Sequence, residues 1–182
     1  MTQNYHRYLN LPFTIDKPES FKELKENDYY DYWDNKIVPK VINEWLDSVG
    51  LYNIHTEAFF TAPNNSIDIH CDTPELDNHV KINFTWGAPT STTRWWRLLE
   101  GRSYKPWNSK DGGVLVAREN DCELVYEKVI DRPSLINVGM LHSTYNPSKQ
   151  GRWTLCLVPC PKGSKDLLLW DDALVFLKDY ID

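Results

Sequence analysis

Between residues 54 and 158 the chain is a succession of short segments rich in β-branched and aromatic residues, each bounded by turn formers. Segments of this length and composition predict β-strands, because such side chains suit a pleated, half-buried surface. Eight strands are expected, over residues 54–60, 67–71, 80–86, 93–99, 114–117, 124–130, 134–140 and 153–158. Their spacing favours antiparallel connections, and therefore a sandwich or a barrel.

Helices are predicted on either side of these strands. Apolar residues recur over residues 36–49 with a spacing near 3.6, and Gly50 follows as a stop signal. Near the other end, Asp171 can cap a helix over residues 172–180. The predicted fold class is thus mainly β with flanking helices, a double-stranded β-helix or jelly roll. A plain β-sandwich is the alternative.

The length of 182 residues suits one domain. We expect a helical N-terminal part over residues 1–50, a jelly-roll core over residues 54–158 and a C-terminal helix over residues 171–181. No window approaches the unbroken apolar run that a membrane span needs, and the first residues lack the pattern of a secretory signal. A cytoplasmic protein is therefore expected.

Charge and cysteine usage exclude further classes. The formal net charge of −6 opposes a nucleic-acid partner, because phosphate backbones are normally bound by a basic surface. The 4 cysteines are too sparse for a disulfide framework and form no CxxC pair. They are expected to be reduced structural thiols.

Two histidines and one aspartate suggest a metal site. His70 and Asp72 are two residues apart, so on a strand both side chains project from one face. His142 follows the largely apolar segment 134–141, which reads as a buried strand. Each element alone has an ordinary explanation, such as a surface histidine beside a turn-forming aspartate. Together they form the two-histidine, one-carboxylate set that suits non-haem Fe(II).

Arg152 and Thr154 follow His142 across the turn at residues 146–151. If that turn closes a hairpin, His142 and Arg152 lie roughly opposite each other and share one face of the sheet. An arginine with a hydroxyl two residues later suits the far carboxylate of a dicarboxylic acid. Asn83 is a further candidate, because Lys81, Asn83 and Thr85 alternate with apolar residues and expose one polar face.

The chain resembles the Fe(II)- and 2-oxoglutarate-dependent oxygenase superfamily. The family pattern H-x-D followed by a distal histidine matches His70, Asp72 and His142, and the later R-x-S/T matches Arg152 and Thr154. The resemblance extends over residues 54–158 and is greatest to small, single-domain bacterial and phage members. It implies that iron is held by His70, Asp72 and His142, that 2-oxoglutarate is anchored by Arg152, and that no catalytic residue beyond the metal ligands is needed.

By the same resemblance, 2-oxoglutarate and dioxygen are consumed to oxidise a C–H bond of a small-molecule or peptidyl substrate, giving succinate and carbon dioxide. One alternative is a cupin-like enzyme with another divalent metal and no 2-oxoglutarate. From a different class, an aromatic-rich jelly roll can serve as a non-catalytic carbohydrate-binding module. No motif in the sequence identifies the substrate to be oxidised.

Overall fold

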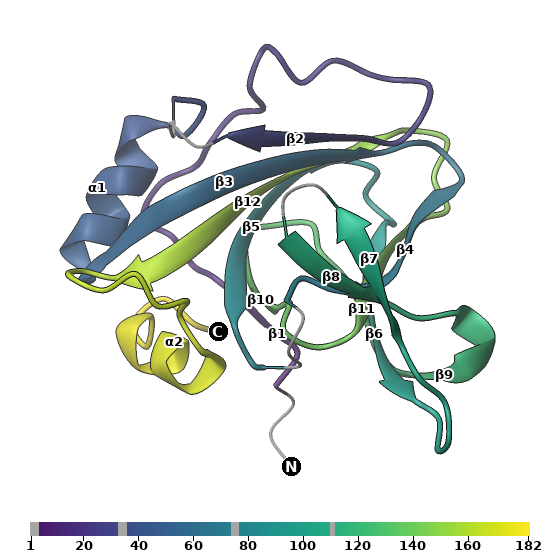
Figure 1. Cartoon of the computed structure of the whole chain (residues 1–182). Coiled ribbons are helices and arrows are strands. Elements are labelled where there is room, and N and C mark those ends of the chain that lie inside the picture. Colours follow the sequence, from purple (N-terminus) through teal and green to yellow (C-terminus); the bar gives the residue numbers. More distant parts are fainter. Residues whose placement is uncertain (1–3, 33–35, 74–76, 110–111) are drawn as a thin grey trace.

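The computed structural model describes residues 4–32, 36–73, 77–109 and 112–182. Two antiparallel sheets of six strands each face one another (Figure 1). The first sheet has the order β1 (His6–Tyr8), β10 (Ser134–Asn137), β5 (Val80–Gly87), β12 (Arg152–Pro161), β3 (Leu51–Thr61) and β2 (Asp28–Tyr32). The second has the order β7 (Lys105–Ser109), β8 (Gly112–Val116), β4 (Asn65–Cys71), β11 (His142–Asn146), β6 (Thr92–Leu98) and β9 (Cys122–Val129).

The chain alternates between the two sheets as it winds. It passes from β3 in the first sheet to β4 in the second, back to β5 and over to β6, and later from β10 to β11 to β12 in the same manner. This alternation is the winding of a double-stranded β-helix. The predicted fold class, mainly β with flanking helices, is confirmed.

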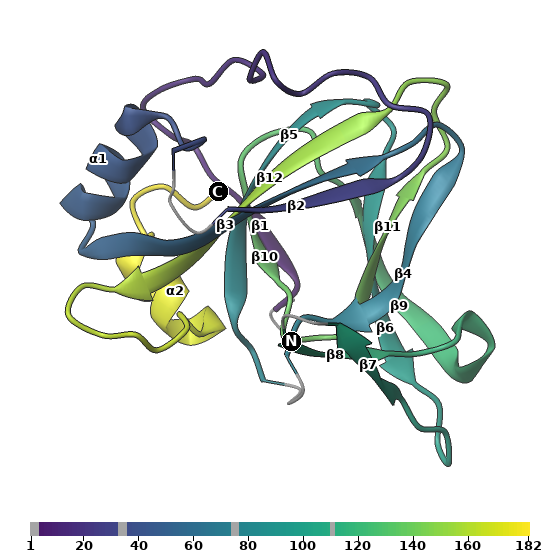
Figure 2. The same ribbon diagram turned by 45° about the horizontal axis from the view of Figure 1, so that its top comes forward.

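The two α-helices of the described ranges cover the first sheet. Both α1 (Lys40–Ser48) and α2 (Trp170–Phe176) lie on its outer side (Figure 2), and a short 3₁₀ helix spans Glu119–Asp121. The largest apolar core lies under these helices, where Trp45 and Trp170 pack with Leu155 and Phe84 of the sheet. Among the described residues, no helix has the length and hydropathy that a membrane crossing requires.

Strand alternation divides the first sheet into an apolar and a polar face. Along β12, Trp153, Leu155 and Leu157 belong to the helix-covered core. The residues between them therefore point the other way, toward the second sheet. Those residues include Arg152, Thr154 and Cys156. In this way the sequence pattern of one strand supplies both the core and a polar interior.

Several predicted elements differ from the structure. The strand expected over residues 134–140 ends at Asn137, because the chain crosses there to the second sheet and starts β11 at His142. Four short strands, β1, β2, β7 and β11, were not predicted; three to five residues give too little alternation to recognise.

The helix predictions also need correction. The described part of residues 1–50 is not mainly helical, since it contains β1, β2 and irregular chain before the nine-residue α1. At the C-terminus, Leu169 and not Asp171 occupies the position before the helix, and no side chain caps it. Asp171 instead lies in the first turn, where a carboxylate still suits the positive end of the helix dipole. The helix ends at Phe176, before the expected boundary.

Candidate metal centre and its pocket

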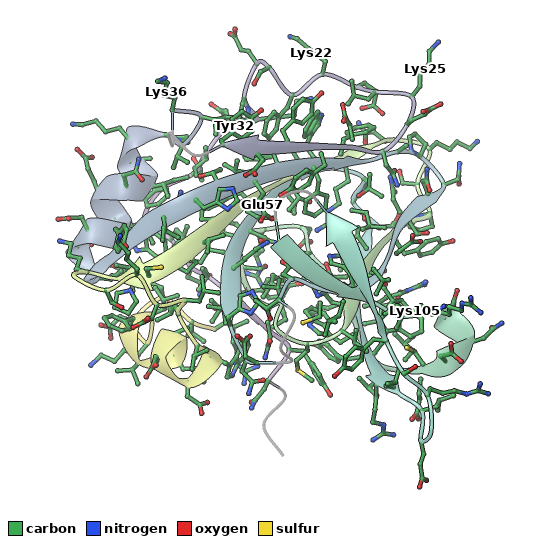
Figure 3. The ribbon with its side chains drawn as sticks, in the orientation of Figure 1. Lys22, Lys25, Tyr32, Lys36, Glu57 and Lys105 are labelled. Atoms are coloured by element: carbon green, nitrogen blue, oxygen red, sulfur yellow. The ribbon has the colours of Figure 1, made fainter. Side chains whose placement is uncertain are left out.

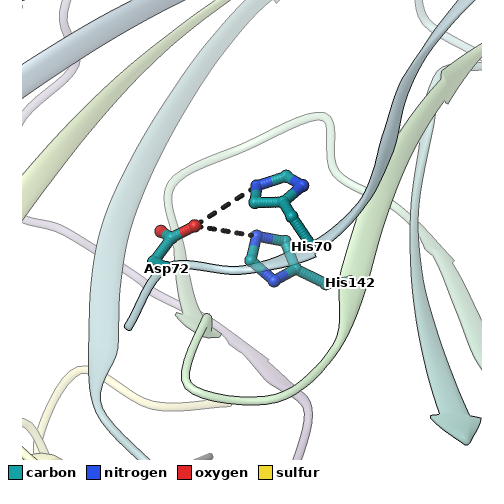
Figure 4. A group of neighbouring side chains, drawn as sticks. All are labelled: His70, Asp72 and His142. Carbon is teal, nitrogen blue, oxygen red and sulfur yellow. Dashed lines mark ion pairs between the residues drawn. The ribbon is translucent and has the colours of Figure 1, made fainter. Parts of the chain in front are cut away.

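His70, Asp72 and His142 converge between the two sheets. His70 lies in β4, Asp72 follows the end of that strand, and His142 is the first residue of β11 and the register partner of His70. Asp72 Oδ1 is 3.2 Å from His70 Nε2 and 3.8 Å from His142 Nε2 (Figure 4). One ligand atom from each residue lies within 4.8 Å of the other two. The three side chains therefore present a compact set of two nitrogens and one oxygen.

Backbone carbonyls fix both imidazole rings. His70 Nδ1 donates to the Asp68 carbonyl at 2.7 Å, and His142 Nδ1 donates to the Met140 carbonyl at 2.9 Å. In each case the acceptor is the carbonyl two residues earlier. With Nδ1 carrying the proton, the Nε2 lone pair is free to bind a metal, which is the usual outer arrangement of a ligating histidine.

The charge states suit a cation. Burial alone would raise the Asp72 pKa, but Lys81 and His70 outweigh this effect and hold the pKa well below its usual range. Burial lowers the His142 pKa to about 3, so this ring is neutral. Burial also acts to lower the His70 pKa, but the hydrogen bond to Asp72 reverses the shift and raises it. A metal ion would displace that proton when it binds.

Lys81 joins the cluster from β5. Its ammonium lies 2.6 Å from Asp72 Oδ2 and 2.5 Å from Glu57 Oε2, and the residue is only 6% exposed. Burial acts to lower the Lys81 pKa, but the two carboxylates raise it well above its ordinary value. This interior therefore contains a lysine that remains charged, held between two anions.

A cavity of about 1830 Å³ opens over the cluster. Its lining includes all three members of the cluster together with Lys81 and Asn83 of the first sheet. Such a volume accommodates a small ligand together with part of a larger substrate. The polar face that the sequence predicted for β5 thus borders the cavity at Lys81 and Asn83.

Arg152 is buried, and no residue of the described ranges gives it an acidic partner. It is 1% exposed and lies on the same face of β12 as Cys156, which lines the cavity. Its Nη1 donates to Ser91 Oγ at 3.1 Å, while Nε and Nη2 have no hydrogen-bond partner among the described residues. Burial lowers the Arg152 pKa to about 10, so the guanidinium is still charged at neutral pH. A buried cation with two free donors is costly unless an anion binds there.

Two further polar atoms beside Arg152 on the first sheet have no hydrogen-bond partner in the part of the chain that is described. They are Thr154 Oγ1 on the same strand and Thr61 Oγ1, whose residue is the register partner of Arg152. Asn83 Oδ1 on β5 also has no partner among the described residues, but Asn83 is in register with Cys156, four residues along β12 from Arg152. All three residues are buried, and unsatisfied buried polar groups are typical of a site for a polar ligand.

The structure places His70, Asp72, His142 and Asn83 in the lining of the cavity, whereas Arg152 and Thr154 are buried on the inner face of β12 and are not among the lining residues. Arg152 also reaches this face by a different route from the one expected. The hairpin prediction is wrong: β11 pairs with β4 and β6, whereas β12 pairs with β3 and β5. The turn at residues 146–151 therefore carries the chain from one sheet to the other. His142 and Arg152 lie on opposite walls of the interior and not side by side on one face.

Sequence reasoning missed Glu57 and Ser91. Glu57 lies in β3 between the buried Thr56 and Ala58. This alternation could have indicated that its side chain points to the opposite face of the strand. Ser91 lies in a loop before β6, and its hydroxyl donates to the Tyr145 carbonyl at 3.0 Å while it accepts from Arg152. No local pattern identifies such a loop residue.

Neither a protein-family model nor a curated protein matches this chain. Solved structures with a similar fold include Escherichia coli ycfD, at 10% identity over 87% of this chain with a TM-score of 0.43. An oxalate oxidase with bound glycolate is similar at 12% identity over 93% of this chain and 79% of that one, with a TM-score of 0.39. The nickel complex of the non-heme monooxygenase ThoJ is similar at 17% identity over 74% of this chain, with a TM-score of 0.37.

The chain spans 42% of the length of ycfD and 60% of that of ThoJ. At these identities and scores the similarity concerns the fold and assigns no function. The functional argument therefore depends on the side chains of the site.

Proposed function

We propose that this chain is an Fe(II)- and 2-oxoglutarate-dependent oxygenase, a hydroxylase of a substrate still to be identified. The observation that supports it is the buried Arg152, which has two N–H donors without a partner among the described residues and lies on the sheet opposite the His70, Asp72 and His142 cluster. Two histidines and one carboxylate leave coordination positions open for other ligands, which suits non-haem iron. The free guanidinium donors suit a carboxylate, which can accept both at once.

Charge balance favours a dianion as the co-substrate. The half-buried carboxylates of Asp72 and Glu57 pair with the buried Lys81, whereas Arg152 has no anion beside it among the described residues. A divalent metal would add a second centre of positive charge at the cluster. A ligand with two carboxylates, such as 2-oxoglutarate, can place one at the metal and the other at Arg152, whereas a monocarboxylate can satisfy only one of them.

Each residue has a defined part in this proposal. His70, Asp72 and His142 hold the iron, and their backbone and lysine contacts keep the ligand atoms oriented. Arg152 and Thr154 bind the far carboxylate of 2-oxoglutarate, and Asn83, which lines the cavity, contacts the same molecule. When bound, iron and 2-oxoglutarate supply the oxidation of a C–H bond by dioxygen, with succinate and carbon dioxide as co-products. The protein orients its ligands and excludes bulk water.

The prime substrate is proposed to be a small molecule or a peptidyl side chain that enters through the cavity. The cupin-like alternative, with a metal and no 2-oxoglutarate, accounts for the metal cluster but not for the free donors of Arg152. A carbohydrate-binding jelly roll accounts for neither. The proposal therefore explains more of the buried polar groups than either alternative.

The test is a screen of candidate substrates for stimulated succinate formation by the protein loaded anaerobically with Fe(II). Asp72→Ala removes the carboxylate that faces both histidines and should abolish turnover. Asp172→Ala is the matched control, because Asp172 is exposed on α2 and does not line the cavity. Metal-dependent turnover without any need for 2-oxoglutarate would favour the cupin-like alternative. Glycan binding that survives chelation would favour the carbohydrate-binding one.

A further inference from the structure

Lys81 makes ion pairs with two carboxylates on different elements. Its Nζ lies 2.6 Å from Asp72 Oδ2, beyond β4, and 2.5 Å from Glu57 Oε2, on β3. The side chain of Lys81 is 7% exposed, and those of Asp72 and Glu57 are each 16% exposed. Figure 3 shows Glu57 in the middle of the molecule, whereas Lys22 and Lys25 extend from its edge. These are interior ion pairs, in which geometry matters more than in exposed ones.

The two oxygens of the Asp72 carboxylate face different partners. Oδ2 is taken by the ammonium, while Oδ1 lies beside Nε2 of both histidines (Figure 4). A carboxylate that is free at both oxygens can rotate about its last bond or present both atoms to a cation. With Oδ2 fixed, only Oδ1 is available on the histidine side.

Lys81 is in turn held in place. It lies within β5, which is hydrogen-bonded on both sides, to β10 and to β12. Glu57 lies on β3, on the far side of β12, where the small Cys156 is its register partner. The ammonium therefore has Glu57 on one side and Asp72 on the other.

We propose that Lys81 is a positioning residue for the metal centre. It holds Asp72 by Oδ2, so that the carboxylate binds the metal through Oδ1 alone, and Glu57 fixes the ammonium from the opposite side. This inference rests on the metal site of the proposed function but not on 2-oxoglutarate or any substrate. The competing explanation is that Lys81 merely neutralises Glu57 and has no effect on the metal.

Cobalt(II) binding, followed by visible absorption, tests the two explanations without any catalytic assay. Lys81→Met keeps the length of the side chain and removes the ammonium. Lys81→Met combined with Glu57→Gln also removes the buried charge that the first substitution leaves unpaired. Lys40→Met is the matched control, since Lys40 pairs with Glu44 on the exposed face of α1 at 2.7 Å. His142→Ala provides the reference for loss of a metal ligand.

We expect Lys81→Met to weaken cobalt binding by about tenfold to a hundredfold, as is typical when an outer partner of a metal ligand is removed. The double variant should bind cobalt as weakly as Lys81→Met. Its melting temperature without metal should nevertheless recover, because the uncharged side chain at position 57 no longer needs a cationic partner. If Lys81→Met does not fold, the double variant carries the measurement. Lys40→Met should bind cobalt like the unaltered protein.

Cobalt affinity in the double variant equal to or above that of the unaltered protein would overturn the inference, because neutralising Glu57 would then be the whole role of Lys81. Unchanged affinity in His142→Ala would overturn the metal site itself, and the inference with it. A failure to form succinate with intact cobalt binding would count against the proposed function alone.

Discussion

His142 and Arg152 open consecutive strands but stand on opposite walls of the jelly roll. His142 begins β11 in the second sheet, and Arg152 begins β12 in the first. Ser91 connects the two walls, because its hydroxyl accepts from Arg152 and donates to the carbonyl of Tyr145 in β11. Through Ser91, the guanidinium on the first sheet is therefore hydrogen-bonded to the strand of the second sheet that begins with His142.

Loss of either histidine should remove the metal. The purified protein is expected to bind one Fe(II) ion per chain, and His70→Ala or His142→Ala should strongly reduce the iron content, because the remaining two ligands cannot complete the facial set. Iron is measured after anaerobic loading and desalting. His6→Phe serves as a histidine control outside the cluster and should keep full iron content. Full iron content in both alanine variants would disprove the ligand assignment.

The proposed binding of 2-oxoglutarate by Arg152 and Thr154 can be tested with a graded series of substitutions. Arg152→Ala should raise the KM for 2-oxoglutarate by at least about tenfold, because charge-assisted hydrogen bonds contribute roughly 1.5–3 kcal/mol and about 1.4 kcal/mol corresponds to a factor of ten. Arg152→Lys should recover part of this loss, since a point charge cannot bind a carboxylate at two points. Thr154→Val should have the smallest effect, near the roughly 0.5–1.5 kcal/mol of a neutral hydrogen bond.

This series is measured as succinate formed against 2-oxoglutarate concentration, with iron saturation checked in each protein. Iron should stay bound in every variant of this series, because Arg152 and Thr154 do not belong to the proposed metal-ligand cluster. An unchanged KM in Arg152→Ala would exclude the anchor and favour the cupin-like alternative.

Ser91 should act through Arg152. Ser91→Ala leaves the Arg152 Nη1 donor without its partner, so the guanidinium loses its fixed orientation. We expect a rise of about threefold to tenfold in the KM for 2-oxoglutarate, corresponding to one hydrogen bond, with little change in kcat. Ser134→Ala is the control, because it removes another buried hydroxyl, one that donates to the Arg132 carbonyl at 2.8 Å. Equal KM changes in both variants would mean that the effect is general loosening of the fold.

His6 should make stability depend on acid pH. Burial, followed by the nearby charges of Lys128, Arg7 and Arg132, lowers the His6 pKa from 6.5 to about 4. Between these two pH values the unfolded chain takes up the proton and the folded chain does not, so stability is full above pH 6.5 and declines as pH falls toward 4. His6→Phe keeps the ring beside Tyr8 and cannot titrate.

Melting temperatures of the unaltered protein and His6→Phe, measured without metal across this pH range, check the prediction. The difference between the two should grow in favour of the variant as the solution becomes more acidic. Parallel curves would contradict it.

The sequence predicted the structure best where a local pattern of alternating residues was long enough to recognise. Strands such as β3, β5 and β12 were predictable because their alternation is long enough to read. The break between Asn137 and His142 was not, since the apolar run continues while the chain changes sheets. His70 and Asp72 follow from a spacing of two, whereas the contact of Lys81 with Glu57 depends on which strands flank β12. Pairing between distant strands carries no local sequence pattern.

Under the proposed function, the division of the site between two sheets limits the length of diacid that can bind. A ligand that reaches from a metal held by His70, Asp72 and His142 to Arg152 on the opposite sheet would have to match the gap between the sheets, and that gap is set by core packing and not by the site residues. A keto diacid one methylene shorter or longer than 2-oxoglutarate should therefore fail at one end or the other. Substitutions that shift the sheets, far from the cluster, would be expected to change which diacid length is accepted.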